Sequence, residues 1–349
     1  MIRLLAAFQV MLIHGIEHLG LTGSYLDYLR IFPGVPIFFV ISGYLISASY
    51  ETSQTTFNYF KNRCLRIYPA LWACIFISSL MLIMMNKFNA SPSNLAIWLF
   101  SQMTFFQFYN HGIFSDFGTG VVNGSLWTIS VELQFYFILP LLYWFYNKYK
   151  PAKIMLILLF LFFLLIKQIH NMLHFKFLEI HPPMWLDLLS VSLPTYLYYF
   201  CIGIFFQNNK DIIKKYLQGH VLFYGFIYLI WSYIACKMNL TIFDNYINPL
   251  SGFILSLFIF SFAYSNVNLS ALLKGNDVSY GIYIYHMLVI NFLVEIGFIS
   301  KWYDLLLTCV ITTVLAYLSW KCIEKPALKL KKYSILSLSR NEKLQALTY

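Results

Sequence analysis

The chain has 349 residues, of which 60% are hydrophobic, 20% are aromatic and only 11% are charged. Soluble domains are about half apolar and about a quarter charged, so this composition excludes an ordinary soluble enzyme. The formal net charge of +10 does not indicate nucleic-acid binding, because the basic residues are scattered between hydrophobic runs instead of forming one basic face. The composition predicts a polytopic membrane protein, and we expect no nucleic acid among its partners.

Hydrophobic runs long enough to cross a bilayer recur along the whole chain. A transmembrane helix needs about 17 to 25 predominantly apolar residues to cross a hydrocarbon core of ~30 Å. We therefore predict an all-α transmembrane bundle of about ten spans. The predicted spans are residues 3–20, 34–50, 67–86, 124–146, 152–168, 184–206, 217–236, 249–265, 278–299 and 303–322.

The lysines and arginines predict an orientation for this bundle. If successive loops alternate between the two sides, 18 of the 24 lysines and arginines lie on the side of both termini and six on the other. Cytoplasmic loops carry the excess of basic residues in membrane proteins, so we expect both termini in the cytoplasm. The expected domains are a membrane domain, residues 1–325, and a basic cytoplasmic tail, residues 326–349, lying on the membrane surface.

Ionisable residues in the first run give the first indication of a functional site, because such residues are costly inside a membrane. Arg3 lies at the cytoplasmic end of this helix, and His14 lies about 16 Å above it at a rise of 1.5 Å per residue. His14, Glu17 and His18 share one helical face and match the HxxEH pattern of one class of zinc peptidases. A five-residue pattern often arises by chance, so an intramembrane metalloenzyme is a minor alternative and we expect no metal.

Arg63 and Arg66 fall in the connection between the second and third runs, just before Tyr68 and Pro69. Two guanidinium groups one helical turn apart can face the same way and bind phosphate in bidentate fashion, which a lysine pair would do less well. Membrane anchoring by the positive-inside rule is the alternative explanation of this pair.

Two more ionisable residues lie inside later runs. Glu132 is about 12 Å from the outer surface, and His286 is about 12 Å from the cytoplasmic start of its run. A glutamate at this depth must be paired, hydrogen-bonded or protonated, and hydrogen bonding between helices would account for His286. The depths predict that His14, Glu132 and His286 can converge near the midplane, with the three arginines on the cytoplasmic side.

Taken together, these segments resemble the acyltransferase-3 family of integral-membrane acyltransferases, which includes O-acetyltransferases of bacterial surface polysaccharides. The matching segments span nearly the whole chain in the order of the family. They are Arg3-x10-His14, the run from Pro33 through Ser42 to Ile46, Arg63-x2-Arg66 with Tyr68-Pro69, Ser125-Leu-Trp127 to Glu132, Ser279-Tyr-Gly to His286, and Glu324-Lys-Pro326.

The resemblance implies that His14 is the catalytic histidine and that the three arginines serve the acyl-CoA side. It also implies that an acyl group, with acetyl as the leading choice, passes to an acceptor at the outer face of a bacterial inner membrane. The expected partners are acyl-CoA as the donor substrate, a glycan or lipid-linked glycan as the acceptor, and membrane lipids, with no permanently bound cofactor. The chain departs from the family pattern in beginning almost at Arg3, and no hydrolase-like domain follows the last predicted span. We therefore expect a shorter cytoplasmic edge of the donor site and acceptor selection by the outer loops or a partner.

Acyl transfer from a thioester to a hydroxyl needs a base and hydrogen-bond donors for the developing oxyanion. We expect His14 to be the base, oriented by Glu132 or Glu17. A two-step route that first acylates His14 or Ser42 stays open, and Tyr68 and His286 are expected in supporting roles. The alternative from another class is a transporter or flippase for a glycan or lipid-linked intermediate, for which we would expect inverted repeats; no clear internal repeat is present.

Overall fold

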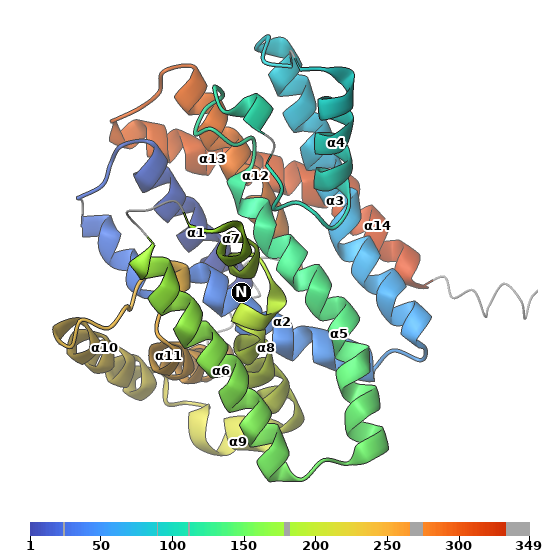
Figure 1. Ribbon diagram of the computed structural model, residues 1–349, viewed down its shortest axis with the longest axis vertical. Coiled ribbons are helices and arrows are strands. Elements are labelled where there is room, and N and C mark those ends of the chain that lie inside the picture. Colours follow the sequence, from blue (N-terminus) through green and yellow to red (C-terminus); the bar gives the residue numbers. More distant parts are fainter. Residues whose placement is uncertain (24, 89, 111, 178–181, 266–274, 333–349) are drawn as a thin grey trace, which may run out of the picture.

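A computed structural model describes residues 1–23, 25–88, 90–110, 112–177, 182–265 and 275–332, and all the regular secondary structure in these ranges is helical (Figure 1). This confirms the all-α prediction. Ten helices coincide with the predicted runs. They are α1 (Ile2–His18), α2 (Gly34–Glu51), α3 (Thr56–Met84), α5 (Trp127–Tyr149), α6 (Lys153–Lys176), α8 (Leu193–Asn208), α10 (Val221–Lys237), α11 (Pro249–Ala263), α12 (Ser279–Glu295) and α13 (Trp302–Ser319).

Shorter helical segments connect or extend these ten. They are η1 (Tyr25–Ile31), α4 (Pro92–Met103), η2 (Gly112–Phe114), η3 (Gly124–Leu126), α7 (Met184–Ser190), α9 (Lys210–Ile212), η4 (Ile213–Leu217), η5 (Asp244–Tyr246), η6 (Trp320–Glu324), α14 (Lys325–Lys329) and η7 (Leu330–Lys332).

Not all ten helices have the dimensions of a membrane span. Within the described ranges, six segments are long and apolar enough to cross a bilayer, and a seventh arises if the pair Lys210–Leu217 and Val221–Lys237, bent by 86°, is one span. Helices α1, α11 and α12 have only 17, 15 and 17 residues. At 1.5 Å per residue each is about 23 to 26 Å long, shorter than a ~30 Å core. The positions of the helices are confirmed, whereas ten crossings and cytoplasmic termini stay predictions.

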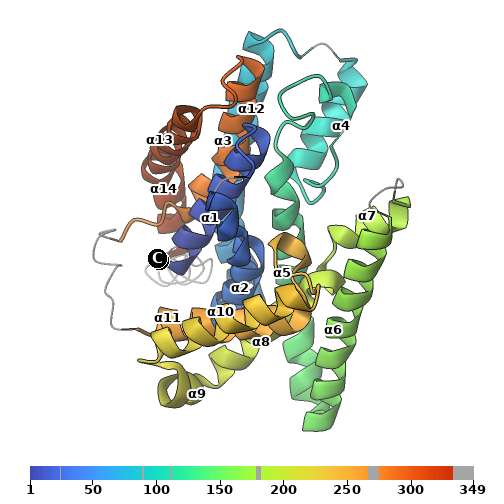
Figure 2. The ribbon, with the colours of Figure 1, turned by 90° about the vertical axis from the view of Figure 1, so that its left-hand side faces the viewer.

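Helix α12 lies in the middle of the bundle, packed against α1 and α13. Nearly all of its residues from Ser279 to Leu293 are buried, as expected for a helix that is apolar on all sides. By contrast, α6 runs along the edge of the bundle (Figure 2) and most of its apolar surface is exposed. Polar side chains on α1 and α12 therefore lie where only protein groups or a cavity can satisfy them.

Helices α2 and α8 pack so closely that two glycines are required between them. A Cβ atom on Gly203 would overlap the carbonyl oxygen of Val40 and the nitrogen of Tyr44, and a Cβ atom on Gly43 would overlap the backbone of Phe200. Small residues of this kind let transmembrane helices approach each other closely. The contact fixes the backbone beside Gly43, including the adjacent Ser42.

We predict that Gly203→Ala destabilises the protein by about 1–3 kcal/mol, the usual cost of overpacking, because the new methyl group meets backbone atoms that cannot rotate away. Thermal unfolding of the purified protein in detergent would measure the effect. Gly112→Ala is the control, since a Cβ atom there meets nothing within 4 Å. Equal unfolding temperatures for the two variants would contradict the close approach of α2 and α8.

Candidate active site

A partly open cavity lies between α1, α2, α3, α5 and α12. Its lining is mostly aromatic and aliphatic, with a few charged or hydroxyl-bearing side chains pointing inward. Such a composition is typical of ligand sites, in which few polar groups fix the orientation of a largely apolar ligand. The charged or hydroxyl-bearing lining residues are Arg3, Ser42, Arg66, Thr128, Glu132, Tyr136, Ser279, Tyr280 and Tyr283.

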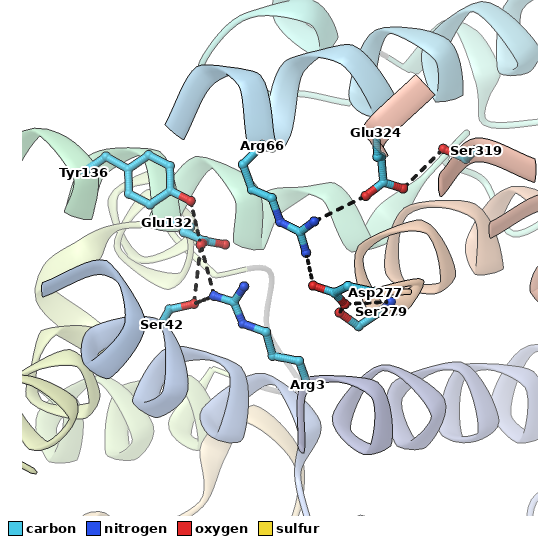
Figure 3. Close-up of polar contacts among 9 residues, drawn as sticks. All are labelled: Arg3, Ser42, Arg66, Glu132, Tyr136, Asp277, Ser279, Ser319 and Glu324. Carbon is cyan, nitrogen blue, oxygen red and sulfur yellow. Dashed lines mark hydrogen bonds and ion pairs between the residues drawn. The ribbon is translucent and has the colours of Figure 1, made fainter. Parts of the chain in front are cut away.

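Arg3, Ser42 and Glu132 meet at one wall of this cavity, each from a different helix (Figure 3). The guanidinium Nη2 of Arg3 donates to Ser42 Oγ at 3.1 Å and lies 3.9 Å from Glu132 Oε1. Ser42 Oγ and Tyr136 OH both donate to the same Glu132 oxygen, at 3.3 and 2.8 Å. The expectation that Glu132 must be paired or hydrogen-bonded is confirmed.

The group formed by Arg3, Ser42 and Glu132 can still contact a ligand. The side chains of Arg3 and Glu132 are 20% and 25% exposed, and Arg3 Nε has no hydrogen-bond partner. An unsatisfied buried donor costs free energy unless a ligand or water completes it. Arg3 can therefore offer a donor to a carbonyl oxygen while its opposite side stays paired with Glu132.

Arg66 lies on the opposite side of the cavity between two carboxylates (Figure 3). Its Nη2 is 2.6 Å from Asp277 Oδ2, and its Nη1 is 3.6 Å from Glu324 Oε2. The guanidinium carbon also lies 5.9 and 6.0 Å from the ring centroids of Tyr280 and Trp320. Arg66 thus joins α3 to the start of α12 and to η6, which the sequence did not predict. Its role toward phosphate stays a prediction.

Asp277 precedes α12 and completes this network. Burial by itself would raise the pKa of Asp277, but the charge of Arg66 and two hydrogen bonds from Ser279 lower the pKa below its ordinary value. The carboxylate is therefore ionised at neutral pH and holds Arg66 as a charged pair.

Arg63 has a different environment from Arg66. Its Nη2 donates to Ser49 Oγ at 2.9 Å, its guanidinium carbon lies 5.8 Å from the ring centroid of Tyr136, and its Nε has no partner. Among the described residues it has no carboxylate within ion-pair distance. We expected the side chains of Arg63 and Arg66 to face the same way. Their contacts within the protein contradict this, because Arg63 contacts α2 and α5 while Arg66 contacts α12 and η6.

His14 and His286 form the second polar group, at the interface of α1 and α12. His14 Nδ1 lies 2.9 Å from His286 Nε2, and the two rings are stacked with centroids 5.1 Å apart. His286 is fully buried, and its Nδ1 lies 3.2 Å from the carbonyl oxygen of Ile282. The convergence of the two histidines is confirmed.

These contacts define the protonation of the neutral pair. The Ile282 carbonyl can only accept, so His286 carries its proton on Nδ1 and accepts at Nε2. His14 must then donate from Nδ1, which leaves its Nε2 unprotonated. A neutral imidazole held in this tautomer has the free lone pair that a general base needs.

The residue that orients His14 is therefore a histidine and not a glutamate. Glu132 is committed to Arg3, Ser42 and Tyr136, so its predicted convergence with the histidines is wrong. Glu17 Oε2 lies 3.3 Å from Arg30 Nη2. Glu132 pairs with Arg3 because an ion pair offsets more of the cost of burial than a neutral imidazole does, whereas the Glu17 side chain, which is 50% exposed, pairs with Arg30.

Arg30 was not anticipated as a partner of the first helix. Its Nη1 lies 2.8 Å from Asp244 Oδ2 in η5, 214 positions later in the chain. Because Arg30 also contacts Glu17, it links the end of α1 to η5.

Within the described ranges, no group of three or more histidine, cysteine, aspartate or glutamate side chains could hold a metal ion. The HxxEH pattern of His14, Glu17 and His18 therefore gains no support from the arrangement of these side chains.

Tyr283 connects the histidine pair to the cavity. It lines the cavity, and its ring centroid lies 5.7 Å from that of His286. Its hydroxyl is held by Thr128 at 2.7 Å, and its ring contacts Phe38 edge-on at 5.1 Å. Tyr68 packs against Trp72 and is not among the residues that line the cavity, so its supporting role stays a prediction.

Comparisons with known proteins agree with this architecture. The family described as Acyltransferase domain matches residues 1–321. Nodulation protein 10 of Rhizobium leguminosarum bv. viciae is 32% identical over 350 residues, covering 95% of this chain and 93% of the relative. The O-acetyl transferase of Shigella phage Sf6 is 27% identical over 93% of each chain. The peptidoglycan O-acetyltransferase OatA of Listeria monocytogenes is 30% identical over 31% of this chain and 19% of its own length. No solved structure matches.

The family match and the O-acetyltransferase relatives support a membrane O-acyltransferase, and the described ranges hold six or seven membrane-length helices. The chain belongs to the acyltransferase-3 family, because the family match covers almost all of it. Membership decides against the transporter alternative, since the related proteins transfer acyl groups.

We predict that Arg66→Ala lowers the stability of the protein by about 3–5 kcal/mol, because it leaves the carboxylate of Glu324 buried and unpaired. Thermal unfolding in detergent would measure the loss, and adding Glu324→Gln should recover part of it. Arg63→Ala is the matched control, one helical turn away and without a carboxylate partner. If Arg63→Ala and Arg66→Ala unfolded at the same temperature, the network around Arg66 would not be structural.

His14→Ala should lower kcat by about 10²–10⁴-fold, the usual contribution of a general base, in a protein that still folds. His286→Ala should also lower kcat, whereas His286→Gln should retain more activity because its side chain can still accept from His14. Acyl transfer by purified variants would be measured against His220→Ala, which replaces an exposed histidine. Full activity of His14→Ala would overturn the assignment.

Proposed function

We propose that this protein transfers an acyl group, with acetyl as the leading choice, from cytoplasmic acyl-CoA to a hydroxyl of a carbohydrate at the outer face of a bacterial inner membrane. The acceptor class is a cell-surface polysaccharide, such as a lipopolysaccharide O-antigen, or its lipid-linked precursor. The observation that carries the proposal is the layout of α1, which presents Arg3 to the cavity and His14 to the histidine pair about 16 Å farther along the helix.

The cavity suits the donor. Its mostly apolar lining matches the chemistry of an acyl chain and a pantetheine arm, while Arg63 lies beyond it as a cation for a phosphate group. Arg3 can donate a hydrogen bond to the pantetheine arm of the donor while that arm lies in the cavity, about 16 Å along α1 from His14. Glu132 keeps Arg3 in position by pairing with its Nη2.

The histidine pair suits the acceptor. In a direct transfer, His14 Nε2 removes the proton from the acceptor hydroxyl as its oxygen bonds to the acyl carbon. The bond from that carbon to sulfur then breaks, and the CoA thiolate takes the proton from His14. The growing positive charge on His14 is shared with His286 through the hydrogen bond between them.

The thioester must pass Tyr283 to meet His14, because Tyr283 lines the cavity and lies against His286. The two-step route through Ser42 is the second arrangement that the residues allow, since Ser42 Oγ lies in the cavity and donates to the carboxylate of Glu132. In that route Ser42 Oγ gives its proton to Glu132 as it bonds to the acyl carbon, the bond from that carbon to sulfur breaks, and CoA leaves with the proton. The acceptor hydroxyl then displaces Ser42 from the ester, and its proton returns to Ser42 Oγ.

Comparing the surface glycan of cells with and without the gene should reveal an acyl-sized mass difference. The reason is that each transfer adds one acyl group and releases CoA. Mass spectrometry of the purified glycan would measure it, and the gene carrying His14→Ala is the control that should behave like its absence. An unchanged glycan in cells that make the folded protein would contradict a surface-polysaccharide acceptor.

A further inference from the structure

The last described segment of the chain, η7, packs against α3, and α14 lies along the same helix (Figure 1). This places Lys331 beside the helix that carries Arg63 and Arg66. Burial and the positive charges of these two arginines lower the pKa of Lys331 to about 8. The sequence had predicted only that this basic tail lies on the membrane surface.

Arg63, Arg66 and Lys331 therefore lie at the same end of α3, but the carboxylates near them pair with only one of the three. Arg66 pairs with Asp277 and Glu324. Arg63 and Lys331 have no carboxylate within ion-pair distance among the residues that the structure describes. Within the described part of the chain, two positive charges are left without a counterion.

Such an arrangement is unfavourable without an anion. Like charges repel more strongly where the effective dielectric is lower than in water, and Lys331 is partly buried. Arg63 Nε is also a buried donor without a partner. An anion between the two side chains would remove the repulsion and complete the hydrogen bonding, and a phosphate group has the charge and acceptor oxygens to do so.

We propose that Arg63 and Lys331 together bind a phosphate group of the acyl-CoA donor, so that the start of the C-terminal tail forms one wall of the donor site. The inference rests on the proposed function and adds to it a residue outside the expected membrane domain. Lys331 is a binding residue for the part of the donor that does not react, and the acyl group is handled by the histidines.

The test compares two donors with the same thioester, acetyl-CoA and acetyl-pantetheine, of which only the first carries phosphate groups. We expect Lys331→Ala to lower kcat/KM for acetyl-CoA about tenfold or more, as for the loss of one charge-assisted hydrogen bond, and to leave kcat/KM for acetyl-pantetheine unchanged. Lys331→Glu should lower the acetyl-CoA value further. Lys329→Ala is the matched control, since Lys329 is exposed on α14 and should affect neither donor.

Equal losses with both donors would mean that Lys331 supports the fold or contacts a lipid phosphate, and no loss with either would mean that it binds nothing. Both results overturn the proposal. Failure of the proposed function itself gives a different result, because the unaltered protein would then transfer acetyl from neither donor.

Discussion

Arg3 and Glu132 lie 3.9 Å apart among apolar helices, with Ser42 bonded to both. None of these groups could be buried alone, because an unpaired charge in an apolar medium costs several kcal/mol. Together they hold α1, α2 and α5 around one cavity, which the close contact of α2 with α8 makes rigid at Gly43. The cavity is thus a consequence of the way in which this bundle satisfies its buried charges.

Helix α1 also carries His14, the proposed base for acyl transfer. His14 is held by His286, whose own proton is fixed by the carbonyl of Ile282. The proposed base and the proposed donor-binding group therefore share one helix, and their separation of about 16 Å follows from the helical rise. Tyr283 stands between the two groups, so access from the cavity to the base depends on how this side chain packs.

The sequence predicted the helical class and the positions of the main helices, and it singled out Arg3, Ser42, Glu132, His14 and His286 as polar residues in hydrophobic runs, because hydropathy and the cost of buried polar residues are local properties. It did not predict how those residues pair. Whether Glu132 meets Arg3 or His14 depends on the rotation of three helices, and the link between Arg66 and Glu324 depends on where the chain returns after α13. The number of crossings also depends on the lengths of helices such as α11, whose 15 residues end before the hydrophobic run does.

The most direct measurement of the central claim is acyl transfer across a bilayer. The purified protein would be placed in sealed vesicles with labelled acetyl-CoA on one side and a glycan acceptor enclosed on the other. The account predicts that label appears on the enclosed glycan with the unaltered protein and not with His14→Ala. Label that reaches the glycan only when donor and acceptor share a side would contradict the proposed path along α1 from the cavity to the histidine pair.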